Sequence, residues 1–158
     1  MEEKKFYLTK HKLKELEREH ESLVVFERSK KMGEEAPKVL ESEDLNPEFI
    51  SFQEDMVFLR SRIEELKNVL EHYELIKKPS KEKQIFVNLG AKVKIEVAGE
   101  KDEFIILGTL EANPNLGRIS NESPVGKALL GHKVGDIITI SSPIKTTYII
   151  KNIKYEMS

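Results

Sequence analysis

The stretch FISFQEDMVFLRSRIEELKNVLEHY, residues 49–73, decides the fold of the first half of the chain. Its apolar residues recur at alternating spacings of three and four, and they are Phe49, Phe52, Met56, Leu59, Ile63, Leu66, Leu70 and Tyr73. Charged residues such as Glu54, Arg60 and Lys67 occupy the other faces. This heptad pattern is typical of a long helix that packs against another helix along one narrow stripe.

The residues on either side mark the ends of this helix. Asn46 is a favourable N-cap residue, and Pro47 follows it at the first helical position, where proline is well tolerated. Pro79 predicts an end near Lys78. At about 1.5 Å per residue, such a helix is a rod of roughly 45 Å.

A narrow apolar stripe needs a partner, and the preceding sequence offers one. Leu13, Leu16 and Leu23 have helical spacing, and Thr9 is placed to cap their helix. Two helices joined by a polar loop form an antiparallel hairpin more readily than two separate rods. We therefore expect a projecting antiparallel coiled-coil hairpin over residues 1–80. The alternative is a pair of helices packed on a globular core.

After Ser80 the apolar period changes to that of strands. The predicted order is a strand over 91–97, a turn over 100–102, a strand over 104–107, a helix over 123–131, and strands over 137–140 and 146–155. This order predicts a small domain over residues 81–158, in which one helix covers an antiparallel sheet. The fold class is therefore α+β, with the domain boundary close to residue 80.

Composition narrows the functional class. The chain has 158 residues, no cysteine and a net charge of −2, and it contains no apolar run long enough to cross a membrane. Its N-terminus lacks the apolar core of a signal peptide. We expect a cytoplasmic, non-membrane protein. Neither half has the basic excess of a nucleic-acid binder, so a protein partner is favoured.

No autonomous catalytic site is predicted. The four histidines, at positions 11, 20, 72 and 132, are scattered and form no metal-ligand pattern. The sequence contains no phosphate-binding glycine loop and no nucleophile elbow. We expect neither an enzyme nor a cofactor of its own.

Two charged clusters are candidate contact sites. Arg28, Lys30 and Lys31 could face the phosphate backbone of RNA, or they could form a solvated helix face. Glu41 and the adjacent pair Glu43-Asp44 gather negative charge at the expected bend of the hairpin. Carboxylate oxygens are the ligands that Mg²⁺ prefers, although loop acids are often merely solvated.

A specific motif in the second half resembles a known family. Ile119-Ser120, then the segment SPVGKALLG at 123–131, then Gly135-Asp136, resemble the C-terminal signature of the bacterial Gre transcript-cleavage factors. Weaker similarities are found at Leu8-Thr9, at Arg62-Ile63 and in the closing segment 150–155. Together these similarities extend over essentially the whole chain.

The resemblance implies an architecture and a role. Gre factors have an N-terminal coiled coil and an FKBP-like C-terminal domain, and they act as monomers on RNA polymerase. The globular domain docks at the rim of the secondary channel, and the coiled coil reaches toward the active site. Acids at its tip help hold a Mg²⁺ shared with the polymerase, which then cleaves backtracked RNA near its 3′ end. The factor is thus an accessory protein rather than an enzyme.

The resemblance also suggests residue roles. Asp44 and Glu43 would bind the shared Mg²⁺, with Glu41 as a further tip acid. The docking surface would include Ser123, Pro124, Lys127 and Asp136.

The tip departs from the family pattern, which reads Gly-Asp-aliphatic-x-Glu-Asn-Ala-Glu-Tyr. Segment 46–49 matches the end of that pattern. An ungapped alignment places the two working acids on Ser42 and Leu45, whereas a two-residue deletion keeps the first acid as Asp44. Two mechanisms therefore remain open: stimulation of cleavage, or binding in the channel without cleavage.

Two further classes compete with these. The FKBP-like domain could be a prolyl isomerase, but the chain has no tryptophan for such a pocket. The helices could instead form a generic coiled-coil adaptor.

Overall fold

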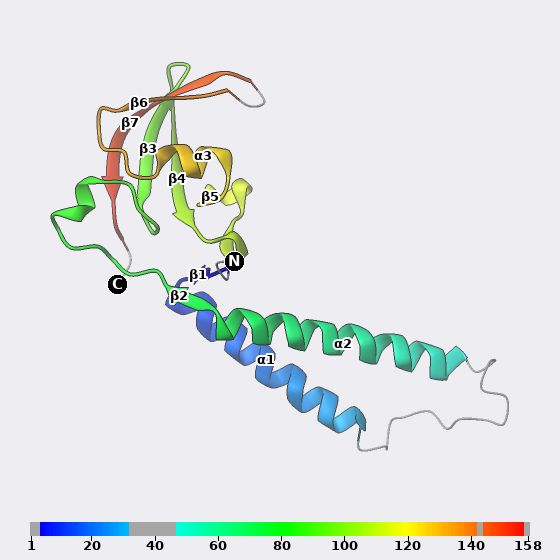
Figure 1. Ribbon diagram of the computed structural model, residues 1–158. Coiled ribbons are helices and arrows are strands. Elements are labelled where there is room, and N and C mark those ends of the chain that lie inside the picture. The colour runs from blue at the N-terminus through cyan, green and yellow to red at the C-terminus, as the bar shows by residue number, and fades with distance from the viewer. Residues whose placement is uncertain (1–3, 32–46, 142–143, 157–158) are drawn as a thin grey trace. The chain divides into compact units, whose positions relative to one another are not determined.

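The computed structural model describes residues 4–31, 47–141 and 144–156 (Figure 1). It confirms the α+β class. The chain divides into two compact units. The sheet unit combines Met1–Lys12 with Tyr73–Ser158, and the helical unit comprises Leu13–His72. The sequence predicted a single boundary near residue 80, whereas in the structure the division falls between His72 and Tyr73, and the N-terminal segment also belongs to the sheet unit.

The helical unit is built from α1 (Lys10–Lys31) and α2 (Pro47–Glu71). Helix α2 starts at the predicted proline, and three of its buried residues, Met56, Leu59 and Leu66, belong to the predicted apolar stripe. Its fourth buried residue, Val69, was not predicted, and the neighbouring stripe residue Leu70 is only half-buried. The predicted end at Lys78 is wrong, because α2 stops at Glu71. The residues that follow are extended and pair with a strand from the N-terminus.

Contacts between α1 and α2 show that the two helices run in opposite directions. Arg62 pairs with Glu19, and Lys30 lies over the ring of Phe52, with 5.9 Å between Nζ and the ring centroid. The contact later in α1, at Lys30, is with the residue earlier in α2, Phe52, as expected for antiparallel helices.

A pair of short strands was not predicted from the sequence. Strands β1 (Phe6–Leu8) and β2 (Tyr73–Leu75) pair in parallel, with Phe6 opposite Tyr73. The amide of Ile76 extends the pairing by donating to the carbonyl of Leu8 at 2.8 Å. This pairing explains why α2 is shorter than its heptad pattern suggests.

The main sheet has five strands in the order β5-β4-β3-β7-β6. Its strands are β3 (Lys92–Val97), β4 (Glu100–Leu107), β5 (Arg118–Ser120), β6 (Ile137–Ile140) and β7 (Thr146–Lys154). All neighbouring strands are antiparallel except β4 and β5. The short helix η2 (Lys83–Ile85) precedes β3, the short helices η3 (Thr109–Glu111) and η4 (Pro114–Leu116) lie between β4 and β5, and α3 (Pro124–Leu129) lies between β5 and β6.

The predicted turn over 100–102 is wrong by a few residues. Strand β4 already begins at Glu100, and the hairpin turns at Ala98 and Gly99. Both turn residues have positive φ, 50° and 80° respectively. A two-residue loop of this kind matches the twist of the flanking strands. The prediction placed the turn at the polar residues 100–102, which instead begin β4.

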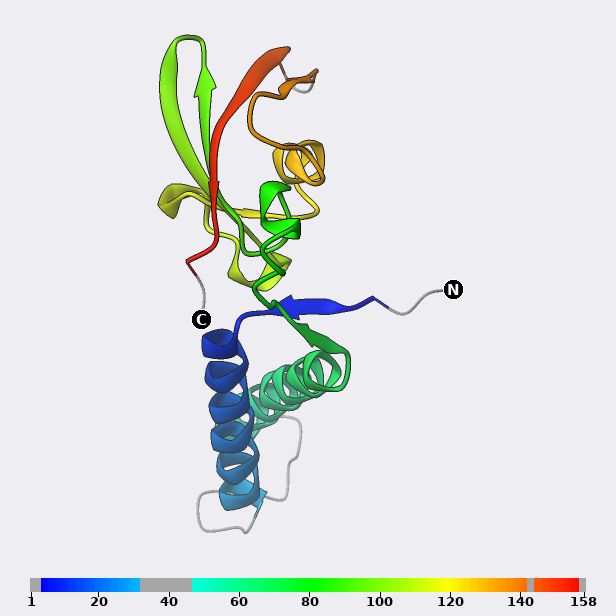
Figure 2. The same cartoon turned by 90° about the vertical axis from the view of Figure 1, so that its left-hand side faces the viewer.

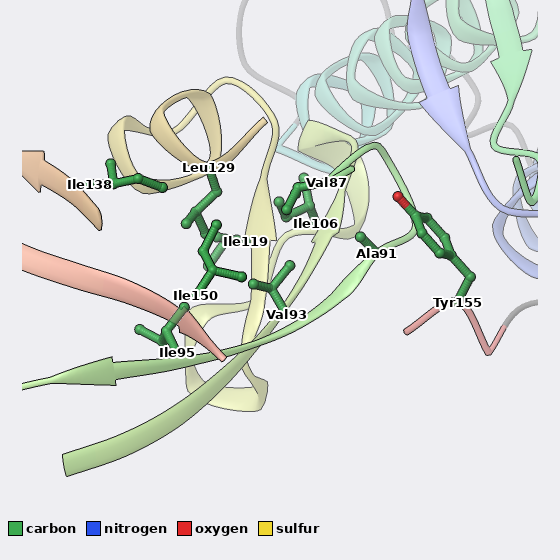
Figure 3. Close-up of a cluster of buried hydrophobic side chains, with 10 residues drawn as sticks. All are labelled: Val87, Ala91, Val93, Ile95, Ile106, Ile119, Leu129, Ile138, Ile150 and Tyr155. Carbon is green, nitrogen blue, oxygen red and sulfur yellow. The ribbon is translucent and has the colours of Figure 1, made fainter. Parts of the chain in front are cut away.

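The core lies between α3 and one face of the five-stranded sheet (Figure 2). Its buried side chains are Val87, Ala91, Val93, Ile95, Ile106, Ile119, Leu129, Ile138, Ile150 and Tyr155 (Figure 3). Leu129 extends from α3 toward the strands and is fully buried. No helix within the described ranges is long and apolar enough to span a membrane.

Candidate functional site

Ser123, predicted as a docking residue, serves as the N-cap of α3. Its Oγ accepts a hydrogen bond from the Gly126 amide at 3.1 Å and donates one to the Ser120 carbonyl at 2.6 Å. A capping serine followed by proline at the first helical position is a favourable start for a helix. The side chain of Ser123 is therefore occupied in holding α3 against the end of β5.

Gly126 allows α3 to approach β5 closely. A Cβ atom at this position would lie 2.0 Å from the carbonyl oxygen of Ser120. Backbone oxygen cannot move aside as a flexible side chain can, so only glycine fits. The motif residues 123 and 126 thus set the position of α3 on the sheet.

Asp136 closes the loop between α3 and β6. Its Oδ2 accepts hydrogen bonds from the Lys133 amide and from the His132 ring nitrogen Nδ1, both at 3.0 Å. The Lys133 hydrogen bond, followed by the His132 contact, lowers the pKa of the Asp136 carboxyl below its ordinary value. The carboxylate therefore stays ionised and stabilises the loop that precedes β6.

The other two predicted docking residues are exposed to solvent. Pro124 and Lys127 are exposed on α3. Lys127 provides a positive charge one turn away from the capping serine. Of the four predicted docking residues, three thus lie on α3 or its cap, and Asp136 lies in the loop that follows.

The basic residues predicted to contact RNA, Arg28, Lys30 and Lys31, do not share one environment in the structure. Arg28 is exposed, whereas the ammonium of Lys30 lies over two aromatic rings, 5.1 Å from the centroid of Phe26 and 5.9 Å from that of Phe52. Phe26 lies on α1 itself, and Phe52 lies on α2, so the second of these cation–π contacts joins Lys30 to the partner helix. The side chain of Lys31 lies outside the described residues, so the predicted contact of all three with RNA stays a prediction.

The tip acids Glu41, Glu43 and Asp44 also lie outside the described residues, as do Ser42 and Leu45. They belong to the segment that connects the end of α1 to the start of α2. Among the residues that the structure does describe, no group of histidines and acids could hold a metal ion. The predicted Mg²⁺ ligands therefore stay predictions.

One polar contact was missed from the sequence. Thr9 was predicted to cap α1, and its Oγ1 does accept from the Lys12 amide at 3.2 Å. Glu111, which is 102 positions away, also binds both the amide and the hydroxyl of Thr9. A contact at that separation leaves no local pattern in the sequence.

Comparison with known proteins identifies the family. The family model "Transcription elongation factor, GreA/GreB, C-term" matches residues 82–155. The transcription elongation factor GreA of Thermomicrobium roseum is 38% identical over 138 residues, covering 86% of this chain and 88% of its own. The transcription elongation factor GreA of Halalkalibacterium halodurans is 36% identical over 146 residues, covering 90% of this chain and 91% of its own.

Among solved structures, Thermus aquaticus Gfh1 is similar, with 26% identity and a TM-score of 0.41 over 96% of this chain and 99% of that one. The resemblance suggested by the motif around α3 is confirmed by the matches in sequence, which extend well beyond that motif into the helical unit. The chain belongs to the GreA/GreB family of transcription elongation factors.

Proposed function

We propose that this protein binds bacterial RNA polymerase at its secondary channel and stimulates cleavage of backtracked RNA. The observation that carries the proposal is the 38% identity, over 86% of this chain, to a protein named transcription elongation factor GreA. A relationship of this extent includes the helical unit as well as the sheet unit. The protein would act as an accessory factor, and the polymerase would perform the hydrolysis.

The helical unit has the properties that the proposed role requires. In this proposal α1 and α2 form a coiled-coil hairpin that enters the channel. Helix α1 has 22 residues and α2 has 25, so at 1.5 Å per residue they are roughly 33 and 37 Å long. Ion pairs and the Lys30–Phe52 contact join the two helices along their length. A joined pair of helices resists bending better than a single helix does. Such a pair could therefore hold the acids at its far end close to the polymerase active site.

The tip would supply carboxylates to the polymerase active site. Asp44, with Glu43 or Glu41, would help hold a Mg²⁺ that the polymerase shares. Oxygen ligands suit this ion, and a second metal can activate water while the first stabilises the leaving oxygen. Within residues 4–31, 47–141 and 144–156, no group of three or more histidine and acidic side chains could hold a metal ion.

In this proposal the sheet unit, an FKBP-like domain, holds the protein at the channel rim. Its docking surface would include α3 and the loop after it, with Pro124 and Lys127 making direct contacts. Ser123 and Asp136 would act by holding that surface in shape, since their side chains are occupied by internal hydrogen bonds.

A second mechanism is favoured by the sequence of the tip. The ungapped alignment to the family pattern replaces both working acids by Ser42 and Leu45. A protein with such a tip would occupy the channel and inhibit the polymerase without activating water.

The deciding experiment uses stalled, backtracked elongation complexes with labelled RNA. Cleavage stimulation predicts shorter RNA on addition of this protein, and Asp44→Ala should abolish the shortening while leaving polymerase binding intact. Glu17→Ala, which removes an exposed acid from α1, is the matched control and should cleave normally. Binding without shortened RNA would support the channel-inhibitor mechanism, and absence of binding would overturn both.

A further inference from the structure

The five-stranded sheet has a second face, which points away from α3. Val93 and Ile95 of β3 are buried in the same cluster as Leu129 of α3 (Figure 3). Because side chains alternate along a strand, the residues between and beside them point to the opposite face. We call this opposite side of the sheet the outer face, and its charged residues on β3 and β4 are Lys92, Lys94, Glu96, Lys101 and Glu103.

The outer face is hollowed along β3 and β4. One groove of about 710 Å³ has Lys94, Lys101 and Lys151 in its lining. A second groove of about 320 Å³ has Lys92 and Arg118 in its lining. Lys92 and Lys94 are two residues apart on the same side of β3, so the two grooves are neighbours on this face.

Lys94 has no ionic partner, although an acid lies opposite it. In the register of β3 and β4, Lys94 faces Glu103, and cross-strand neighbours of opposite charge commonly pair. The carboxylate of Glu103 instead contacts Nζ of Lys92 at 3.1 Å. Lys94 is exposed and forms no ion pair with any residue that the structure describes.

Lys101 is left unpaired in the same way. It lies opposite Glu96, but that carboxylate contacts Nζ of Lys151 at 3.2 Å. Asp102, the remaining acid of the larger groove, accepts a hydrogen bond from the amide of Glu103 at 2.8 Å. Among the described residues, no acid pairs with Lys101.

A third free cation lies on the neighbouring strand β5. Arg118 is opposite Ile105 of β4, and because the next residue, Ile119, is buried in the core, the Arg118 side chain points to the outer face. It is exposed, and in the described part of the chain no ion pair involves its guanidinium. Lys94, Lys101 and Arg118 thus present positive charge that the sheet unit itself does not neutralise.

The acids in the smaller groove already have partners. Glu156 contacts Lys92 at 3.3 Å, and Glu111 accepts hydrogen bonds from the amide and the hydroxyl of Thr9. A ligand on the outer face therefore meets carboxylates that are occupied and cations that are not.

We propose that the outer face is a second protein-binding surface, which holds an acidic segment of a partner protein. Carboxylates of that segment would pair with Lys94, Lys101 and Arg118, whose charges are otherwise uncompensated. The inference goes beyond the proposed function, which assigns polymerase docking to α3 and the loop after it. Because α3 covers the other face of the sheet (Figure 2), the two surfaces can be occupied at the same time.

A protein segment suits the outer face better than RNA does. Single-stranded RNA binds to exposed aromatic rings, whereas Phe104 of β4 and Tyr148 of β7 pack against the core. The carboxylates of Glu96 and Glu103 also lie beside the free lysines, and they repel an evenly spaced row of phosphates. A protein segment can place carboxylates opposite the cations and neutral residues opposite the acids.

Three pairs of substitutions test the surface without changing the core. Lys94→Gln with Lys101→Gln removes two free charges, and Lys94→Arg with Lys101→Arg keeps them. Lys81→Gln with Lys83→Gln is the matched control, because these lysines are exposed in the same unit but line neither groove. All of these side chains are exposed, so the amide resonances of the buried cluster should stay unchanged in every variant.

The first measurement is an NMR titration of the full chain with a synthetic peptide of alternating glutamate and serine. We expect the peptide to shift the amide resonances of β3 and β4 and to leave those of α3 in place. The dissociation constant should rise about two- to fivefold for each charge removed in the glutamine pair, as for an exposed ion pair. The arginine pair and the control pair should bind as the parent does.

The proposal is overturned if the peptide shifts α3 instead or causes no shift, or if the control pair weakens binding as much as the glutamine pair. Oligouridine of equal charge is titrated in parallel. Tighter binding of oligouridine to the outer face would assign that surface to RNA and contradict a protein partner.

The second measurement asks whether the outer face is separate from the polymerase-docking surface. The glutamine pair should bind polymerase with the same half-maximal concentration as the parent, and added peptide should not displace polymerase. Loss of polymerase binding in the glutamine pair would place the outer face within the docking surface and contradict a second partner. If the parent itself does not bind polymerase, the proposed function fails, while the peptide titration still decides the role of the outer face.

Discussion

Arg62 of α2 holds Glu19 of α1 with two parallel hydrogen bonds. Its Nε lies 2.8 Å from Oε1 of Glu19, and its Nη2 lies 3.0 Å from Oε2. The guanidinium also contacts Glu65 one turn further along α2, at 3.3 Å. This two-point contact specifies the register of the antiparallel helices in a way that the apolar stripe alone does not, because leucines can slide by one heptad.

Arg62 and Glu19 should show a measurable coupling in the free energy of unfolding. Both side chains are about one third exposed, so water and salt weaken the interaction. A double-mutant cycle with Glu19→Gln and Arg62→Gln, followed by thermal unfolding, should give a coupling of about 0.5–1 kcal/mol. The coupling should shrink in 1 M salt, where screening acts over only about 3 Å. The exposed pair Lys5–Glu74, at 3.7 Å, is the control and should show less coupling.

Replacing Ala98 should stabilise the sheet unit. Ala98 has a φ of 50°, which is unfavourable for a residue with a Cβ and is better tolerated by asparagine. The change Ala98→Asn creates the Asn-Gly sequence preferred in two-residue hairpins. We expect a gain of about 0.5–1 kcal/mol in the free energy of unfolding, measured with urea. Ala112→Asn, at an exposed residue with a φ of −65°, should give no comparable gain.

Adding one methyl group at Gly126 should destabilise α3. In Gly126→Ala the new Cβ would meet the Ser120 carbonyl oxygen, so either the helix or the strand must shift. Overpacking of this kind costs about 1–3 kcal/mol. Gly131→Asn is the comparison, because the space around Gly131 is open and its φ of 82° suits asparagine. That variant should lose less than about 1 kcal/mol, and an equal loss at both positions would contradict the steric explanation.

The loop that ends at Asp136 should weaken in acid. The hydrogen bonds from Lys133 and His132 lower the pKa of this carboxyl in the folded protein. The stabilisation they give is therefore complete above the ordinary aspartate pKa of about 3.9 and is lost as the pH falls through the lowered folded value. A carboxyl-detected NMR titration should find the Asp136 midpoint below about 3.9. A midpoint at or above that value would show that the contacts do not persist in solution.

The sequence predicted those elements whose signals are local. The apolar stripe located α2, and the serine and proline before Val125 located the start of α3. The predicted end of α2 was wrong because β2 pairs with β1, and the paired residues are 67 positions apart in the sequence. Glu111 was missed for the same reason. Its carboxylate contacts Thr9, and nothing in the segment around η3 indicates a contact with a helix start elsewhere in the chain.

The hydroxyl of Tyr155 connects the end of the chain to the segment before β3. It donates to the Phe86 carbonyl at 2.6 Å and accepts from the Asn88 amide at 2.9 Å, and the residue is only 7% exposed. Tyr155→Phe removes both hydrogen bonds and leaves two backbone groups without their partner. We expect a loss of about 1–3 kcal/mol in the free energy of unfolding at neutral pH. Tyr73→Phe, at an exposed ring, should cost much less.

The same hydroxyl makes a specific prediction for alkaline solution. Burial raises the pKa of Tyr155 in the folded protein, and the hydrogen bond from Asn88 offsets this only in part. Above about pH 10 the unfolded chain loses this proton while the folded protein retains it, so the stabilisation is complete below that pH and is lost as the pH rises through the folded pKa. The stability difference between the parent and Tyr155→Phe should therefore narrow above about pH 10. A difference that stayed constant through this range would show that the phenol titrates alike in both states, and that its burial does not oppose ionisation.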